Sequence, residues 1–256
     1  MRSRPRRSQT FVTAFARGLA VIEAFDRATA PLSLADVAGR AGVDRAVARR
    51  MLLTLIELGL VAESQRHYRL TPRVLRLGYS FLSQTGLDGL AQPFVTEVAE
   101  RTGESCSIAL LDETEVVGVA HTPSPVHKVG FTFRPGTRWP AYVMASGRVL
   151  LASRSDTEVR ALLGRMQRKA LTSRTLVKIE AILEAIRMVR QNRFALVDGE
   201  LEEGLISVAV PIHNRSGDVI ASLNSSSSVT RITARKFSES VVPILQGAAR
   251  EMAKIL

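Results

Sequence analysis

Apolar and polar positions alternate with the period of a helix at the start of the chain. Apolar residues at this spacing predict a first helix over residues 10–26. Ser33, followed by Asp36 three positions later, is typical of a capped helix start. We therefore expect a second helix over residues 34–41, which Gly42 ends.

The second helix and the one after it have the spacing of a helix-turn-helix. Asp44 caps a third helix that runs to about residue 58. Ala38 is small enough for two helices to cross closely, and Gly42 tolerates the positive φ of a tight turn. With the apolar positions buried, the residues that point outward from the front of the third helix are Arg45, Ala46, Arg49 and Arg50.

Two short β-like runs follow, over residues 60–63 and 67–70, and the turn between them predicts the hairpin of a winged helix. Arg66 and His67 belong to this hairpin. The motif Thr71-Pro72 then begins another helix, because threonine caps well and proline fits the first helical position.

The rest of the chain mixes strands with helices, which predicts an α+β fold with a mainly antiparallel sheet. The predicted strands cover residues 105–111, 116–121, 129–133, 195–198, 205–212 and 218–225. The predicted helices cover residues 93–101, 145–153, 156–166, 176–192 (with Thr175 as its cap) and 233–256. The expected domains are a disordered basic tail (1–10), a winged helix-turn-helix (11–70), a connecting helix (71–88) and a sensor domain (89–256).

Positive charge is concentrated in the first third of the chain. Residues 1–85 contain 14 Arg against 6 acidic residues, a balance of +8, whereas the other 171 residues contribute only +3 of the total of +11. Such a field attracts polyanions by releasing their counterions. Together with the helix-turn-helix it predicts binding to double-stranded DNA, and arginine is the side chain that most often reads guanine in the major groove.

Two other classes of protein are weighed against a DNA-binding regulator. An enzyme is disfavoured, because no nucleophile elbow, P-loop or complete dinucleotide fingerprint occurs. A metal-sensing regulator would use Cys106, His121, His127 and His213, but their spacing is not that of a ligand set. We therefore expect no catalytic residues, no metal and no cofactor.

The expected setting is a reducing one. A lone cysteine cannot form an intrachain disulfide, and no apolar run approaches the ~20 residues of a membrane span. The expected location is the cytoplasm, without a membrane partner.

From Ala16 onward the sequence resembles the IclR-type transcriptional regulators. The stretches that carry the resemblance are ARGLAVIEAFDRA, LSLADVAGRAGVDRAVARRMLLTLIELGLV, YRLTPRVLRLGYSFLS, RTGESCSIALLD, GTRWPAYVMASGRVLLA, LTSRT and FALVDGELEEGLISVAVPI. The stretches RTGESCSIALLD and PAYVMASGRVLLA are similar to those of one branch of this family. That branch controls protocatechuate and 4-hydroxybenzoate catabolism in the β-ketoadipate pathway.

The resemblance implies a GAF-like effector-binding domain and dimers, often paired into tetramers. It also implies control by a small organic acid, and RNA polymerase would be a further partner if the protein activates transcription. The implied effector residues are Ala145, Ser146, Asp198, Ser207, Asn224 and Ser226. The expected DNA-contacting residues are Ser33, Asp44, Arg45, Ala46, Arg49, Arg50, Arg66 and His67.

The effector site also makes chemical sense. A helix start offers N–H groups to a carboxylate, and Ser and Asn side chains complete the hydrogen bonds. The chain departs from the family pattern at the polar run 224–228 and at Arg134, which leaves the identity of the acid open.

Overall fold

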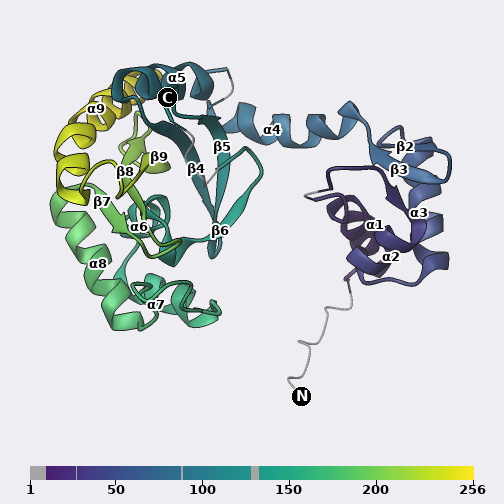
Figure 1. The fold of residues 1–256 in the computed structure, drawn as a ribbon. Helices are drawn as coiled ribbons and strands as arrows, with labels where there is room; N and C mark the ends of the chain where they lie inside the picture. The colour runs from purple at the N-terminus through teal and green to yellow at the C-terminus, as the bar shows by residue number, and fades with distance from the viewer. Residues whose placement is uncertain (1–9, 27, 88, 128–132) are drawn as a thin grey trace. The chain divides into compact units, whose positions relative to one another are not determined.

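The computed structural model describes residues 10–26, 28–87, 89–127 and 133–256. The chain divides into two compact units, residues 1–82 and 83–256 (Figure 1). The predicted disordered tail lies outside the described residues except for Thr10, and the predicted strand over 129–133 lies outside them except for Phe133.

The first unit is a winged helix-turn-helix. Its elements are α1 (Thr13–Glu23), β1 (Leu32–Ser33), α2 (Leu34–Ala41), α3 (Arg45–Glu57), β2 (Val61–Ser64) and β3 (His67–Leu70). The strands form an antiparallel sheet in the order β1-β3-β2. The sequence did not indicate β1, which is only two residues long and is defined by its pairing with β3.

Local signals fix both ends of the turn between α2 and α3. The Ser33 hydroxyl accepts a hydrogen bond from Asp36 N–H while the Asp36 carboxylate accepts one from Ser33 N–H. Gly42 ends α2 with a φ of 63°, which a residue without Cβ adopts at no steric cost. The Asp44 side chain then caps α3 by accepting from Val47 N–H at 2.8 Å. The predicted helix boundaries are confirmed here.

The wing hairpin turns through Gln65 and Arg66, both in the left-handed region with φ of 50° and 60°. Ser64 pairs directly with His67, so the turn has two residues rather than the three predicted. Tyr68 points into the core of the unit and is buried beside Leu32 and Val61.

A 3-10 turn, η1 (Pro72–Val74), and α4 (Leu75–Thr85) follow the wing. The helices of the second unit are α5 (Ala91–Thr102), η2 (Ala141–Val143), α6 (Ala145–Ala152), α7 (Asp156–Arg165), α8 (Ile179–Asn192) and α9 (Ala234–Ile255). Its strands are β4 (Ser105–Asp112), β5 (Glu115–Thr122), β6 (Arg138–Pro140), β7 (Ala195–Asp198), β8 (Leu205–His213) and β9 (Val219–Ser228).

Three layers make up the second unit (Figure 1). In the described residues, the strands form an antiparallel sheet in the order β6-β5-β4-β9-β8-β7, as the predicted α+β class requires. One face packs on α5 and α9 in a single apolar core. The other face is covered by η2, α6, α7 and α8.

Two details of the second unit differ from the sequence prediction. The helix placed over residues 176–192 begins only at Ile179, and Thr175 is not its cap. Instead the Thr175 hydroxyl donates to the carbonyl oxygen of Glu200, 25 residues away. The edge strand β6 was not predicted, because three residues containing a proline carry no strand pattern.

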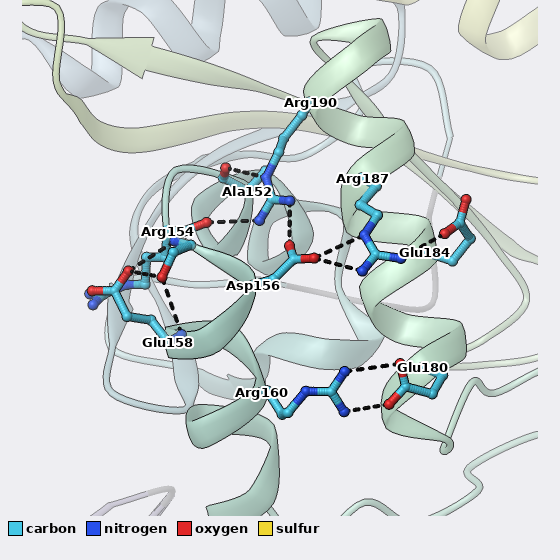
Figure 2. A network of polar contacts seen from close by, with 10 residues as sticks. Ala152, Arg154, Asp156, Glu158, Arg160, Glu180, Glu184, Arg187 and Arg190 are labelled. Atoms are coloured by element: carbon cyan, nitrogen blue, oxygen red, sulfur yellow. Dashed lines mark hydrogen bonds and ion pairs between the residues drawn. The ribbon is translucent and has the colours of Figure 1, made fainter.

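A network of charges joins α7 to α8 on the surface (Figure 2). Asp156 accepts hydrogen bonds from Arg187 at 2.7 Å and from Arg190 at 2.6 Å, and Arg160 pairs with Glu180 one turn further along. Hydrogen bonds from Arg190 and Arg187, and their charges, lower the pKa of Asp156.

We expect the Asp156 network to stabilise the protein only while Asp156 is ionised. A lowered pKa in the folded state means that the stabilisation is present at neutral pH and is lost as the pH falls below about 4. Asp156→Asn should therefore reduce the free energy of unfolding in urea at pH 7, and the deficit should shrink at about pH 3. The control is Glu251→Gln, whose pair with Lys254 lies within one helix. An equal deficit at both pH values would contradict the ion-pair explanation.

Candidate functional site

The front of α3 presents an exposed basic surface. Arg45, Ala46, Arg49 and Arg50 are exposed, while Val47 and Ala48 on the same helix are buried. Among the described residues, none accepts a hydrogen bond or forms an ion pair with the guanidinium groups of Arg45, Arg49 or Arg50. These cations are therefore available to an anionic partner.

The other predicted DNA-contacting residues flank this surface. Ser33 and Asp44 cap α2 and α3, so both have structural roles at the helix starts. The hydrogen bonds from Ser33 lower the pKa of Asp36 and keep that carboxylate charged at the start of α2. Arg66 and His67 are exposed in the wing, and His67 Nδ1 lies 2.9 Å from the Gln65 carbonyl oxygen.

A second polar region lies on the sheet face that α6 covers. Ser207 and Ser226 are directly paired on β8 and β9, and their hydroxyl oxygens are 2.8 Å apart. Asn224, two positions before Ser226, accepts a hydrogen bond of 2.7 Å from Ser107 of β4. Three of the predicted effector residues are thus brought together on adjacent strands.

The start of α6 lies over this polar face and is buried. The helix packs on β4, β8 and β9, and Ala145 and Ser146 are each only 1% exposed. Met144 stands at the N-cap position and supplies no side-chain hydrogen bond. Within the described residues the Ser146 hydroxyl also has no hydrogen-bond partner. A buried helix start with free donors favours an anion.

Sequence reasoning did not assign Ser105, Ser107 or His121 to this region. Ser107 pairs with His121 across β4 and β5, which places His121 on the face that α6 covers. Burial lowers the pKa of His121, and the positive charge of Arg134 lowers it further. A hydrogen bond with the backbone of Cys106 raises the pKa and so opposes part of this shift. His121 is thus held toward its neutral form beside the polar residues. In the sequence, the one feature that pointed to these serines was the alternation of polar and apolar residues in β4. The residues assigned from the family resemblance did not include them.

Asp198 does not join this group. It pairs with Ile206, which lies in the core with α9, so strand alternation directs Asp198 to the opposite face from Ser207. Its carboxylate instead pairs with Arg174 at 2.5 Å.

A buried ion pair lies next to the α6 start. The Arg148 guanidinium donates to the Glu200 carboxylate at 2.5 Å and to the Tyr142 carbonyl oxygen at 3.3 Å. Glu200 also accepts from Leu176 N–H at 3.1 Å. Both charged residues are less than a tenth exposed. The pair therefore links α6 to the preceding η2 turn and to two segments distant in sequence, at Leu176 and at Glu200.

The four residues considered for metal sensing do not converge. Cys106 points into the core with α5 and α9, whereas His121 lies on the other face of the sheet. Burial raises the pKa of the Cys106 thiol. In the described part of the chain no three His, Cys, Asp or Glu side chains form a metal-ligand group. Likewise, none of the described helices is long and apolar enough to cross a bilayer.

Each of the two units matches a domain of a known protein family. The IclR helix-turn-helix domain matches residues 14–64, and the bacterial transcriptional regulator IclR C-terminal domain matches residues 79–254. The chain belongs to the IclR family of bacterial transcriptional regulators. The family resemblance, the fold class and the function as a regulator with a DNA-binding and an effector-binding domain are therefore confirmed.

Individual relatives of this IclR-family regulator cover between 65% and 96% of the chain. The Pca regulon regulatory protein of Pseudomonas putida is 40% identical over 94% of this chain and 83% of its own. A crystal structure of a candidate transcriptional regulator from Rhodococcus sp. RHA1 is 40% identical, with a TM-score of 0.82 over 96% of this chain and 98% of that one. A complex of the Acinetobacter PobR inducer-binding domain (double mutant) with 3-hydroxybenzoic acid is 31% identical, with a TM-score of 0.60 over 65% and 97% of the two chains.

Gly147 makes the position of α6 possible, and this can be tested. A Cβ at residue 147 would overlap the backbone of Ala141, including its carbonyl oxygen. Gly147→Ala should therefore destabilise the protein by about 3 kcal/mol or more, because backbone atoms cannot yield as a side chain can.

The matched control for Gly147→Ala is Gly164→Ala in α7, where an added Cβ meets nothing within 4 Å. That variant should be as stable as the wild type or gain up to about 1 kcal/mol from helix propensity. Urea unfolding of both variants provides the measurement. Wild-type stability in Gly147→Ala would show that α6 does not need this close approach.

Proposed function

We propose that this regulator binds its DNA operator through the front of α3 and the wing, as a homodimer or a dimer of dimers. We further propose that a small aromatic acid binds at the buried start of α6 and controls operator binding. The observation that carries the second proposal is the uncapped helix start with the unpartnered Ser146 hydroxyl above a polar sheet face.

The DNA proposal rests on where the arginines lie. Arg45 and Arg49 are one helical turn apart on the exposed side of α3, with Arg50 beside them. A recognition helix lies in the major groove and contacts base edges with residues of its first turns. Arg66 at the tip of the wing supplies a further cation for the phosphate backbone.

Exposed apolar side chains on the helices support the proposed homodimer. Phe15 and Leu19, four residues apart on α1, are 69% and 43% exposed. Leu77 and Phe81, also four residues apart on α4, are 62% and 52% exposed. Large apolar side chains grouped on a helix surface are typical of a protein–protein contact. Two copies of the helix-turn-helix would also recognise a palindromic operator.

The polar residues around the α6 start match the hydrogen-bonding groups of an aromatic acid. A carboxylate at the α6 start would accept hydrogen bonds from backbone N–H groups and from Ser146. The hydroxyl groups of Ser207 and Ser226, with Asn224, Ser107 and His121, offer neutral donors and acceptors for a ring hydroxyl. Arg134 is a nearby counter-charge, as its effect on the pKa of His121 indicates. Asp198 is left out, because it lies on the other face of its strand.

Two of the relatives favour an aromatic acid over other acids. One relative is named for the Pca regulon, and the PobR domain holds 3-hydroxybenzoic acid. We therefore propose a hydroxylated benzoate as the effector. A metal-sensing role and turnover of the acid are not favoured by any residue group described above.

The recognition surface is tested by Arg45→Ala and Arg49→Ala. Each should weaken binding to the operator by ~1–3 kcal/mol if the side chain contacts a base, and should relax the preference at one position. The operator is first obtained by selection from random duplexes, and affinity is measured by fluorescence anisotropy at fixed salt.

The control for this experiment is Arg101→Ala, which removes the same charge from α5, where Arg101 pairs with Glu97 on the surface. It should leave operator affinity nearly unchanged. If the two α3 variants bind the operator as the wild type does, the proposed recognition surface is wrong.

The effector site is tested by Ser146→Ala. Because the hydroxyl has no hydrogen-bond partner among the described residues, the variant should be as stable as the wild type. Its affinity for 4-hydroxybenzoate or 3-hydroxybenzoate should fall about tenfold, since one hydrogen bond to a charged group is lost. Calorimetry on the full chain measures both acids.

Ser225→Ala is a matched control, because Ser225 is also a buried serine without a partner in the described residues but lies opposite Cys106 on the other sheet face. It should bind the acid as the wild type does. Equal affinity in the Ser146 and Ser225 variants would place the effector elsewhere.

A further inference from the structure

A cleft of about 330 Å³ opens between the end of β8 and α9, away from the residues discussed so far. Val210 and Pro211 of β8 and Ala249 and Ala253 of α9 give it an apolar floor. Its volume lies at the lower end of the range of small-molecule sites, which are mostly apolar with a few placed polar groups.

Two arginines line the cleft. Arg193 ends α8 in a left-handed conformation with a φ of 60°, and Arg250 comes from the next-to-last turn of α9. Neither guanidinium forms an ion pair within the described residues, although Arg187 and Arg190 just before Arg193 both pair with Asp156. The lining also holds His213 and Gln246 but no carboxylate. The cleft therefore combines uncompensated positive charge with an apolar surface.

The open edge of β8 at this cleft is poorly suited to an added peptide strand. The pairing of β7 with β8 ends at Ala209, so among the described strands Val210–His213 have a neighbour on the β9 side alone. Pro211 lies in this stretch and has no N–H to donate to another chain. A small ligand fits the features of the cleft better than a strand does.

The cleft is separate from the proposed effector site. Val210 belongs to the apolar core that the sheet shares with α9. Ala209, its neighbour in sequence, packs with Ala145 of α6 on the opposite face. A ligand in the cleft would therefore lie against α9 and not against the α6 start.

We propose that this cleft binds a small organic dicarboxylate. Each guanidinium presents a planar fork of donors that matches a carboxylate in a bidentate pair. Two unpaired guanidinium groups match two carboxylates, and the apolar floor favours a hydrocarbon chain between them over an inorganic anion. The site is independent of the proposed function of the α6 start.

Adipate is the probe, and equilibrium dialysis of the full chain with labelled adipate counts the bound molecules. The double variant Arg193→Asn with Arg250→Gln should bind one adipate fewer per chain, or bind it at least about tenfold more weakly. Asn is chosen at residue 193 because it tolerates a positive φ. The control Arg235→Gln removes one charge from the exposed first turn of α9 and should bind as the wild type does.

Thermal unfolding of each variant shows that the fold is retained. A competition with sulfate separates the contributions of charge and of the apolar floor: adipate should resist displacement by an equal concentration of sulfate. Equal adipate binding by the wild type and the double variant would overturn the proposal. So would the absence of binding at millimolar adipate, or displacement by sulfate at equal concentration.

Discussion

The second unit depends on how closely the start of α6 approaches the turn before it. Gly147 meets the backbone of Ala141 with no room for a side chain, and one residue later Arg148 forms its buried pair with Glu200. The first interaction sets the distance of the helix from η2, and the second fixes its rotation. Together they hold an uncapped helix start, with Ser146, over the polar residues of β8 and β9.

Stability alone does not account for the Arg148–Glu200 pair. Removing two charges from water is costly, and apolar residues of similar volume often stabilise a core as well or better. The pair does, however, satisfy groups that an apolar pair could not: the Tyr142 carbonyl oxygen and the Leu176 N–H. Its consequence is a unique placement of the segments around α6, which a site built from directed hydrogen bonds requires.

The range of the interactions decides how much the sequence predicts. In the first unit Ser33 contacts Asp36 and Asp44 contacts Val47, so the ends of the helices could be predicted from residues close together in the sequence. In the second unit the Thr175 hydroxyl donates a hydrogen bond to the carbonyl oxygen of Glu200. Ser107 lies close to Asn224 only because their strands pair, although the two residues are 117 positions apart in the sequence. The family resemblance supplied Ser207, Asn224 and Ser226, but it could not show that Asp198 faces the other way or that His121 lies near Ser107.

The DNA-binding surface and the effector site under α6, both proposed above, bind negative charge in opposite ways, and burial explains the difference. The arginines of α3 are exposed, so water and salt solvate them when no DNA is bound. A cation at the α6 start would remain buried and unpaired whenever the effector was absent, at a cost of several kcal/mol. Neutral donors avoid most of that cost. Among the described residues the buried Ser146 hydroxyl has no hydrogen-bond partner, and a carboxylate bound at the proposed site would supply one. An effector that forms this hydrogen bond would stabilise the arrangement of α6 to which it binds. Such a difference in affinity between two arrangements is what lets a ligand shift a regulator from one state to another.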